Sequence, residues 1–267
     1  HTALSWFDSL MLGYFKPMSE VGVYNLALSI AALINLPSIV GNSVLLPIFS
    51  ELHEKKDKNQ IRLTYLTSFR WLSILSLPIL FILISYPDFI LNIVGGNDFV
   101  IGNSALVILS FGFIVSTVII PSTIILLAVG KTKFLLINTL IAIIINFILN
   151  LLLIPKYGFI GAAFSFLITS IVINLLRLIE VKNLLNVFPF NWRYIRLVIS
   201  FLISGLTAYN LTDYLTNNEY LTIILSMTLF TIISFCLFFI LKCYGSEDIE
   251  VLKAVKLKLM GYKNKYR

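Results

Sequence analysis

Long apolar stretches follow one another along this chain, and its basic residues are concentrated in every second gap between them. A helix of about 20 apolar residues crosses the hydrocarbon core of a bilayer, and the stretches that reach this length set the expected spans. We expect them at residues 1–15 (clipped at the start), 22–49, 67–86, 103–129, 132–154, 158–180, 193–212 and 219–242. Backbone polar groups cannot stay unpaired in hydrocarbon, so these spans must be helical. The predicted fold class is therefore all-α, a polytopic bundle of about eight transmembrane helices.

The gaps between the spans predict the orientation. Taken alternately, one set of gaps together with the C-terminal tail holds 18 of the 20 Lys and Arg residues, and the other set holds only Lys16 and Lys156. Cytoplasmic loops carry an excess of Lys and Arg. We therefore expect a multi-pass protein of the cytoplasmic membrane whose C-terminus is cytoplasmic, with the start of the chain on the same side.

The composition agrees with a membrane protein. Apolar residues make up 58% of the chain and charged residues 12%, whereas soluble domains carry roughly 25% charged residues. The net charge of +7 lies in the cytoplasmic gaps and the tail, so we expect the lipid bilayer as a partner and no nucleic acid. The tail, residues 243–267, alternates apolar and basic residues after Ser246. This pattern predicts an amphipathic helix on anionic lipid, or an ordinary basic tail.

Residues that would carry enzymatic chemistry are scarce. The two histidines are His1 and His53, no Cys/His cluster has metal-ligand spacing, and no Gly-rich phosphate loop is present. The sequence therefore predicts no catalytic residues, no metal site and no cofactor. Any transport would be driven by an ion gradient or by the gradient of the substrate.

Asp8 is the most informative single residue because it lies inside an apolar stretch. A carboxylate at such depth costs about 2.5–3.5 kcal/mol on insertion scales and normally faces a cavity or a partner. One interpretation is a proton- or cation-responsive carboxylate in a central cavity. The alternative is that Asp8 lies near the cytoplasmic end of the first span.

Seven asparagines are also placed in the apolar stretches. Asn146 and Asn150 share one helical face. Such amides either bond neighbouring helices together or bind sugar hydroxyls, and we take Asn35, Asn146 and Asn150 as candidates for the second role. Arg70 and Arg177, at predicted cytoplasmic span ends, are candidates for binding phosphate, with anchoring at the membrane surface as the alternative. The seven are Asn25, Asn35, Asn42, Asn138, Asn146, Asn150 and Asn174.

Prolines interrupt several spans. Each removes a backbone hydrogen bond and loosens its helix. In transporters such positions serve as hinges. We therefore take Pro37, Pro78 and Pro121 as hinge candidates.

Several segments resemble the polysaccharide (Wzx-like) flippases of the multidrug/oligosaccharidyl-lipid/polysaccharide exporter superfamily. Their order and spacing carry the resemblance, which covers most of residues 1–180. The segments are Asp8–Phe15, Val21–Ala27, Pro47–Leu52, Gly130–Lys133, and Ile154–Gly158 followed by Gly161–Ala163.

The resemblance implies a fold of fourteen helices, in two lobes of six plus a C-terminal pair. On this basis residues 1–180 would form the second lobe, residues 181–242 the two additional helices, and residues 243–267 the tail. We expect this chain to be part of a longer protein whose N-terminal lobe is missing here. The implied function is flipping of lipid-linked oligosaccharides by alternating access, coupled to a cation. The implied partners are a polyprenyl-linked glycan and glycan-assembly enzymes.

Two other functions fit a chain of this kind. A cation-coupled exporter of small molecules on the same architecture would favour an apolar, aromatic cavity with one or two acids. A membrane-bound glycan polymerase or acyltransferase would place catalytic residues in sizeable external loops. The short external gaps contain neither His nor Arg, and the many amides favour the flippase over the exporter.

Overall fold

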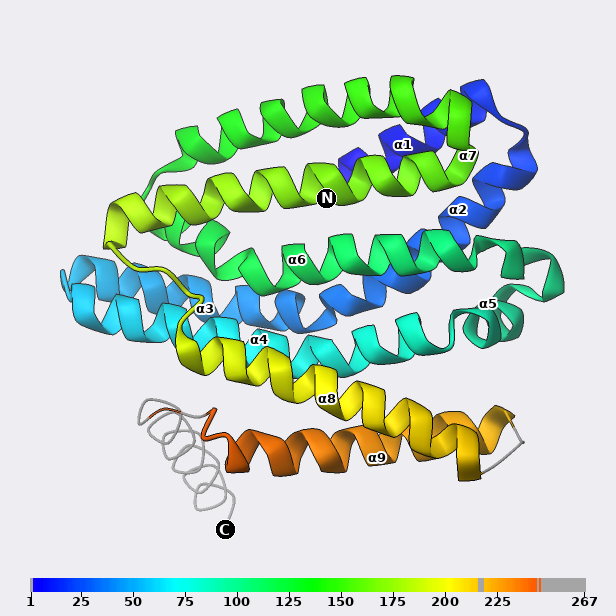
Figure 1. The fold of residues 1–267 in the computed structure, drawn as a ribbon. Coiled ribbons are helices and arrows are strands. Elements are labelled where there is room, and N and C mark those ends of the chain that lie inside the picture. Colours follow the sequence, from blue (N-terminus) through cyan, green and yellow to red (C-terminus); the bar gives the residue numbers. More distant parts are fainter. Residues whose placement is uncertain (1, 216–218, 244, 246–267) are drawn as a thin grey trace, which may run out of the picture.

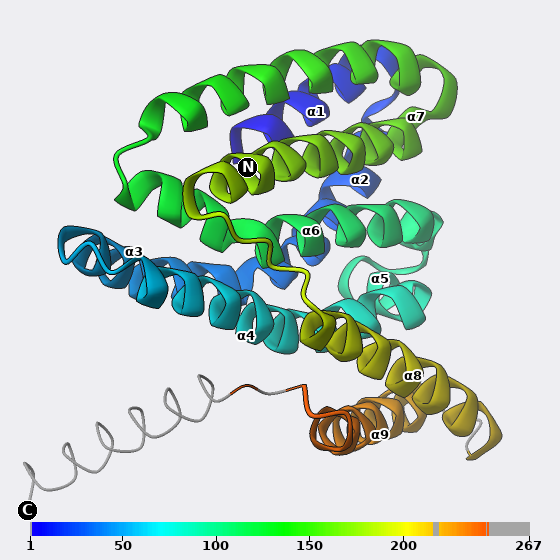
Figure 2. The same cartoon turned by 60° about the vertical axis from the view of Figure 1, so that its left-hand side comes forward.

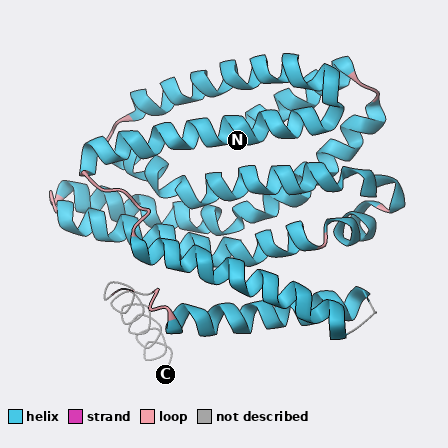
Figure 3. Cartoon of the chain, in the orientation of Figure 1, coloured by secondary structure: helices cyan, strands magenta, loops and turns pink. Residues whose placement is uncertain are grey.

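The computed structural model describes residues 2–215, 219–243 and 245 of the 267-residue chain. The described residues are helical almost throughout (Figure 3). The elements are α1 (Thr2–Phe15), α2 (Met18–Ala31), the 3₁₀ segment η1 (Ala32–Asn35), α3 (Leu36–Glu54), α4 (Lys58–Ser85), α5 (Pro87–Gly95), the 3₁₀ segment η2 (Asn97–Gly102), α6 (Asn103–Ala128), α7 (Thr132–Leu185), α8 (Trp192–Leu215) and α9 (Glu219–Ile240).

Helix α6 is the centre of the bundle. It packs against α2, α3, α4 and α7, and α1 packs on α7 and α2 (Figures 1 and 2). Its buried residues include Leu106, Leu109 and Ile125, and they belong to an apolar core that α1–α4 and α7 share. Because α6 is apolar on every side, it is suited to contact with helices all around it.

Helix α7 is a hairpin of two long arms. It doubles back at Gly158, whose φ of 58° and ψ of −137° are not helical, and Figure 1 shows the two arms side by side. The second arm starts at Phe159, whose backbone N–H donates to Glu20 Oε2 at 3.2 Å. The carboxylate of Glu20 therefore pairs a helix N-terminus, where a negative charge is stabilising.

Helices α8 and α9 form an antiparallel pair that packs on α4 (Figure 1). Phe81 of α4 stacks on Phe230 of α9 with ring centroids 4.2 Å apart and nearly parallel planes. Phe201 of α8 meets the same ring at 5.7 Å. These rings join a second, smaller apolar cluster. The domain limits at residues 180 and 242 stay predictions.

Apolar side chains cover the outside of the bundle. The first arm of α7 carries large exposed ones at Leu136, Leu140, Ile144, Ile148 and Leu152, whereas its asparagines face inward. An apolar exterior over buried polar groups is the arrangement expected in lipid. Six helical segments of the described chain are long and apolar enough to cross a membrane. The prediction of an all-α, multi-pass membrane bundle is confirmed.

Several span limits differ from those expected. The long segment Thr132–Leu185 contains two of the predicted spans, one in each of its arms. Helix α1 has 14 residues. Helix α4 begins at Lys58, well before residue 67, because Asp57 accepts a hydrogen bond from the Gln60 backbone N–H at 3.0 Å and caps it. Helix α5 and η2 fill the gap between the predicted spans 67–86 and 103–129, where the sequence predicted no helix. The predicted tail helix after Ser246 lies outside the described residues.

We predict that Gly158→Ala destabilises the fold. A Cβ at this position would meet the Glu20 carboxylate, and its backbone conformation is strained for any L side chain, at a cost of about 1–3 kcal/mol. Thermal unfolding of the detergent-purified chain measures the loss. Gly22→Ala is the matched control, since a Cβ there meets nothing closer than Phe99 at 3.9 Å. Equal melting temperatures for the two variants would contradict the prediction.

Candidate functional site

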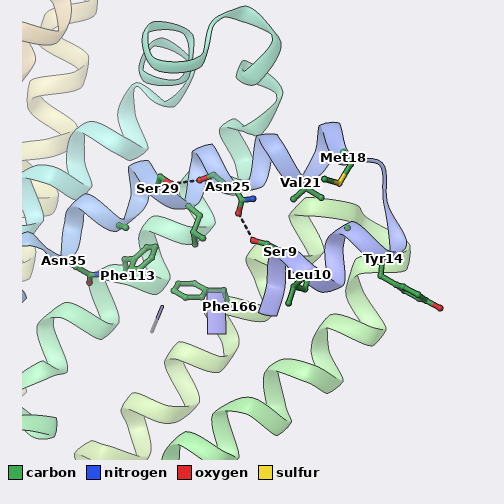
Figure 4. A pocket seen from close by; sticks show the side chains of 13 residues that line it. Ser9, Leu10, Tyr14, Met18, Val21, Asn25, Ser29, Asn35, Phe113 and Phe166 are labelled. Atoms are coloured by element: carbon green, nitrogen blue, oxygen red, sulfur yellow. Dashed lines mark hydrogen bonds between the residues drawn. The ribbon is translucent and has the colours of Figure 1, made fainter. Parts of the chain in front are cut away.

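A cavity near the candidate residues is a groove between α1 and α2, with α6 and α7 behind it. Its volume is about 850 Å³, and Figure 4 shows its walls. Phe113 of α6 and Phe166 of α7 are both buried, lie 4.8 Å apart between ring centroids, and form the floor. The lining residues are Ser9, Leu10, Gly13, Tyr14, Met18, Val21, Asn25, Leu28, Ser29, Ala32, Asn35, Phe113 and Phe166. We call this cavity the α1–α2 groove.

Two asparagine amides in the groove are held by hydroxyl groups. Ser9 Oγ donates to Asn25 Oδ1 at 2.6 Å (Figure 4). Thr117 Oγ1, from α6, donates to Asn35 Oδ1 at 2.7 Å. Asn35 ends η1, the 3₁₀ segment that separates α2 from α3. The groove therefore carries oriented amides on an otherwise mostly apolar wall.

Asp8 lies behind the groove, on the inner side of α1, and is fully buried. Asn150 Nδ2 donates to Asp8 Oδ1 at 2.7 Å, and Tyr24 Oη donates to Asp8 Oδ2 at 3.1 Å. Asn150 Nδ2 also donates to Asn146 Oδ1 at 3.1 Å. The four side chains come from α1, α2 and the first arm of α7, so this centre joins three helices. We call it the Asp8 centre.

The Asp8 centre lies deep in the bundle. Asn150 is 18 residues after the start of α7 at Thr132 and 8 residues before the turn at Gly158. At about 1.5 Å per residue this places it roughly 27 Å and roughly 12 Å from the two ends of that arm. Asp8 is therefore nearer the end of the arm that carries Gly158 than the end that carries Lys131 and Lys133. Its depth in a membrane stays a prediction.

A second polar cavity, of about 210 Å³, lies between the two arms of α7 and reaches Asn146 at one end. At its other end Arg177 Nη1 donates to Asn174 Oδ1 at 3.3 Å. Asn174 Nδ2 donates in turn to Ser116 Oγ of α6 at 3.2 Å. Thr169, which also lines this cavity, is buried and its Oγ1 atom has no hydrogen-bond partner.

The other predicted residues fall in different places. Arg70 is twelve residues inside α4 and 3% exposed, so it lies within the bundle and outside the groove. Pro37 is in the first turn of α3, directly after η1, at a real interruption of the helix. Pro78 and Pro121 lie inside α4 and α6, which continue past them. Their roles as hinges stay predictions.

The sequence analysis missed the partners of the candidate residues. Tyr24 contacts Asp8, and Ser9 and Thr117 orient the two groove amides. A signal did exist for part of the groove: Asn25 and Ser29 are four residues apart, which is the spacing of one helix face. No such pattern marks Thr117, which is 82 residues from its partner.

Comparison with known families decides the relationship. A family model described as MatE matches residues 1–152, which is more than half of the chain. The chain belongs to the MatE family. This is a family of membrane transporters in the exporter superfamily, and membership in it does not support the alternative of a membrane enzyme.

Curated relatives come from archaea. A Haloferax volcanii protein described as "Probable low-salt glycan biosynthesis flippase Agl15" is 31% identical over 159 residues, which are 60% of this chain and 34% of that protein. A second one, "Probable flippase AglR", is 30% identical over 169 residues, or 62% and 35%. An uncharacterized membrane protein of Methanocaldococcus jannaschii, MJ1068, is 31% identical over 166 residues, or 61% and 32%. The matches thus span about a third of these relatives' length.

A solved structure shares the fold. The structure described as "Lipid II flippase MurJ, inward closed conformation" matches 89% of this chain and 52% of its own, with a TM-score of 0.60 and 17% identity. The predicted exporter-type fold is thereby confirmed. At this identity the likeness concerns the fold alone.

We predict that Asp8 and Asn150 depend on each other for stability. Asn150→Leu removes a donor from a buried carboxylate and should lower the free energy of unfolding by about 1–3 kcal/mol. In an Asp8→Asn background the same substitution should cost less, because the charge that needs the donor is gone. Thermal unfolding of the parent, the two single variants and the double variant measures the coupling. Additive effects would contradict a direct interaction.

Proposed function

We propose that this chain forms part of a flippase that moves lipid-linked oligosaccharides across the cytoplasmic membrane by alternating access. The α1–α2 groove supports the proposal most strongly, because it places amide and hydroxyl groups on a membrane-embedded surface that is otherwise apolar. Two curated relatives are described as flippases, one of them for glycan biosynthesis. A polar glycan needs such a lined path, whereas its polyprenyl tail stays in lipid.

The proposal includes a partner for the groove. An alternating-access transporter needs two lobes that rock about a site near the midplane. The groove is open on the side away from α6 and α7, and the exposed apolar side chains Leu10, Tyr14 and Met18 line its rim. We propose an N-terminal lobe as the opposite wall, with residues 1–180 as the second lobe and residues 181–242 as an additional helix pair. Glycan-assembly enzymes would supply the substrate.

The Asp8 centre would couple transport to a cation. Asp8 has no ion-pair partner among the described residues, so its hydrogen bonds leave its charge uncompensated. Asn150 Oδ1 is buried without a hydrogen-bond partner. A carboxylate beside a spare amide oxygen suits a hard cation such as sodium, which prefers oxygen ligands, and it suits a proton equally. Asn146, which accepts from Asn150 at 3.1 Å, would contribute to the same centre. Arg177, at the far end of the 210 Å³ cavity, stays a candidate for binding phosphate.

An exporter of small molecules is the second candidate. The groove lining is mostly apolar, with Phe113 and Phe166 at its floor, and such a surface also suits an amphipathic drug. Deletion of the gene should block delivery of the glycan to the cell surface if the protein is a flippase, and should raise drug sensitivity if it is an exporter. The deletion experiment below therefore separates the two functions.

We predict that loss of the protein that contains this chain traps lipid-linked oligosaccharides on the cytoplasmic face. Glycosidase digestion of the exposed glycan in right-side-out and inverted membrane vesicles shows on which face of the membrane the glycan lies. The parent gene should restore the glycan to the outer face. A normal surface glycan with a new sensitivity to drugs would favour the exporter.

We predict that Asp8→Asn abolishes the ion dependence of transport and lowers its rate at least tenfold, because the coupling charge is removed. Transport in proteoliposomes with and without imposed sodium and proton gradients measures both. Asp98→Asn is the matched control, since Asp98 is exposed in η2 and should transport normally. Equal rates for the two variants would argue against a role of Asp8 in coupling.

We predict opposite sides for two loops. Gln60→Cys, at the start of α4, should react with a membrane-impermeant thiol reagent only from the cytoplasm, and Asp98→Cys only from outside, as the distribution of basic residues requires. Both are introduced into a Cys236→Ser, Cys243→Ser background. Both sites are exposed in the fold, so labelling of both from one side would contradict the proposed topology.

A further inference from the structure

The two amides of the α1–α2 groove are oriented alike. In each, the carbonyl oxygen accepts a hydroxyl proton: Ser9 Oγ donates to Asn25 Oδ1 at 2.6 Å, and Thr117 Oγ1 donates to Asn35 Oδ1 at 2.7 Å. Within the described residues neither Asn25 Nδ2 nor Asn35 Nδ2 takes part in a hydrogen bond. An amide NH₂ group carries two donors. Both asparagines therefore present N–H donors to a ligand, while their carbonyl oxygens already accept a hydrogen bond from the protein.

The lining of the groove is uncharged. None of the described residues that line it is Asp, Glu, Lys, Arg or His. Asp8 neighbours Ser9 in sequence but is turned inward and fully buried. An anionic group placed against this wall would lose its water without gaining an opposite charge, which is costly. The wall thus favours a neutral ligand that accepts hydrogen bonds.

The two amides are also well separated. Asn35 is ten residues after Asn25 along α2 and η1, which corresponds to about 15 Å along the helix. This is longer than one sugar ring. Ser29 lies between them on the same lining, and the volume of about 850 Å³ is in the range of small-ligand pockets. A ligand that uses both amides therefore has at least two rings.

We propose that the α1–α2 groove is a binding site for an uncharged oligosaccharide of two or more rings, which Asn25 and Asn35 hold by donating to its hydroxyl or acetamido oxygens. Ser9 and Thr117 act as positioning residues, because each fixes the amide plane of one asparagine. Apolar ring faces rest against the floor made by Phe113 and Phe166. The inference rests on the proposed function and deepens it, since it assigns to this wall the neutral sugars and leaves the charged pyrophosphate link to another surface.

The placement of Asn35 gives binding a structural consequence. Asn35 ends the 3₁₀ segment between α2 and α3, and its link to Thr117 ties that interruption to α6. A sugar that bonds to this amide acts on the point where the long segment Met18–Glu54 is not α-helical. A ligand in the groove therefore contacts the 3₁₀ interruption between α2 and α3.

The test measures binding to the purified full chain in detergent by saturation-transfer NMR. The probes are N,N′-diacetylchitobiose and cellobiose as neutral disaccharides, and digalacturonate as an anionic one. We expect saturation of the neutral probes and at least fivefold less of the anionic one. The double variant Asn25→Leu, Asn35→Leu should lose the signal. Ser9→Ala and Thr117→Val, which keep both amides, should each weaken binding about three- to tenfold, the effect of one net hydrogen bond.

Thr123→Val is the matched control for Thr117→Val. It removes a hydroxyl from the same helix, and Thr123 Oγ1 is buried without a hydrogen-bond partner, so binding should stay at the parent level. Melting temperatures check that each variant is folded. If the double asparagine variant unfolds, the comparison of Thr117→Val with Thr123→Val decides. Equal binding by those two variants, or preference for digalacturonate, would overturn the proposal.

The result is separable from that of the proposed function. Binding to neutral disaccharides requires no transport, so a chain that binds them with this dependence on Asn25 and Asn35 supports the site even if no flipping is found. Flipping that persists undiminished in the double asparagine variant would leave the flippase intact and overturn the site.

Discussion

Polar side chains in hydrocarbon must find partners inside the protein, and this requirement organises the bundle. Buried asparagines of α7 bond to groups on other helices: Asn150 to Asp8 of α1, and Asn174 to Ser116 of α6. Asn138 in the first arm donates to Glu180 in the second at 2.9 Å. Lipid provides no hydrophobic force between helices, so such bonds and close packing hold them together. Apolar side chains therefore make up the outer surface of the bundle.

The same rule explains why the two polar regions differ. The Asp8 centre is fully enclosed, and its carboxylate receives donors from two helices. The α1–α2 groove is open, and its amides keep donors for a ligand. Helix α1 separates them, with Asp8 on one face and Ser9 on the next. A change in the position of α1 would therefore act on both regions, and the proposed coupling needs a link of this kind.

The chain spans only part of the length of the proteins it resembles. It covers 52% of the MurJ structure whose fold it shares and about a third of the curated relatives. The open groove lies between helices that begin the matched family region, residues 1–152, whereas α8 and α9 pack apart from it on α4. The Asp8 centre lies wholly within the family region, and so does the groove except for Phe166 of its floor. Helices α8 and α9 contribute apolar packing against Phe81 through Phe201 and Phe230.

The sequence by itself determined the fold class, the places of most spans and the unusual position of a carboxylate, Asp8, in an apolar stretch, because apolar length and an isolated carboxylate have direct energetic meaning in a bilayer. It also placed Asn146 and Asn150 on one helical face, since helical periodicity is local. Only the tertiary structure decided that Asp8 faces away from the groove, that Arg70 is buried, and that Thr117 holds Asn35. These depend on helix rotation and on contacts between residues far apart in the chain, and hydrophobic periodicity is too weak to fix rotation in helices that are apolar on nearly every side.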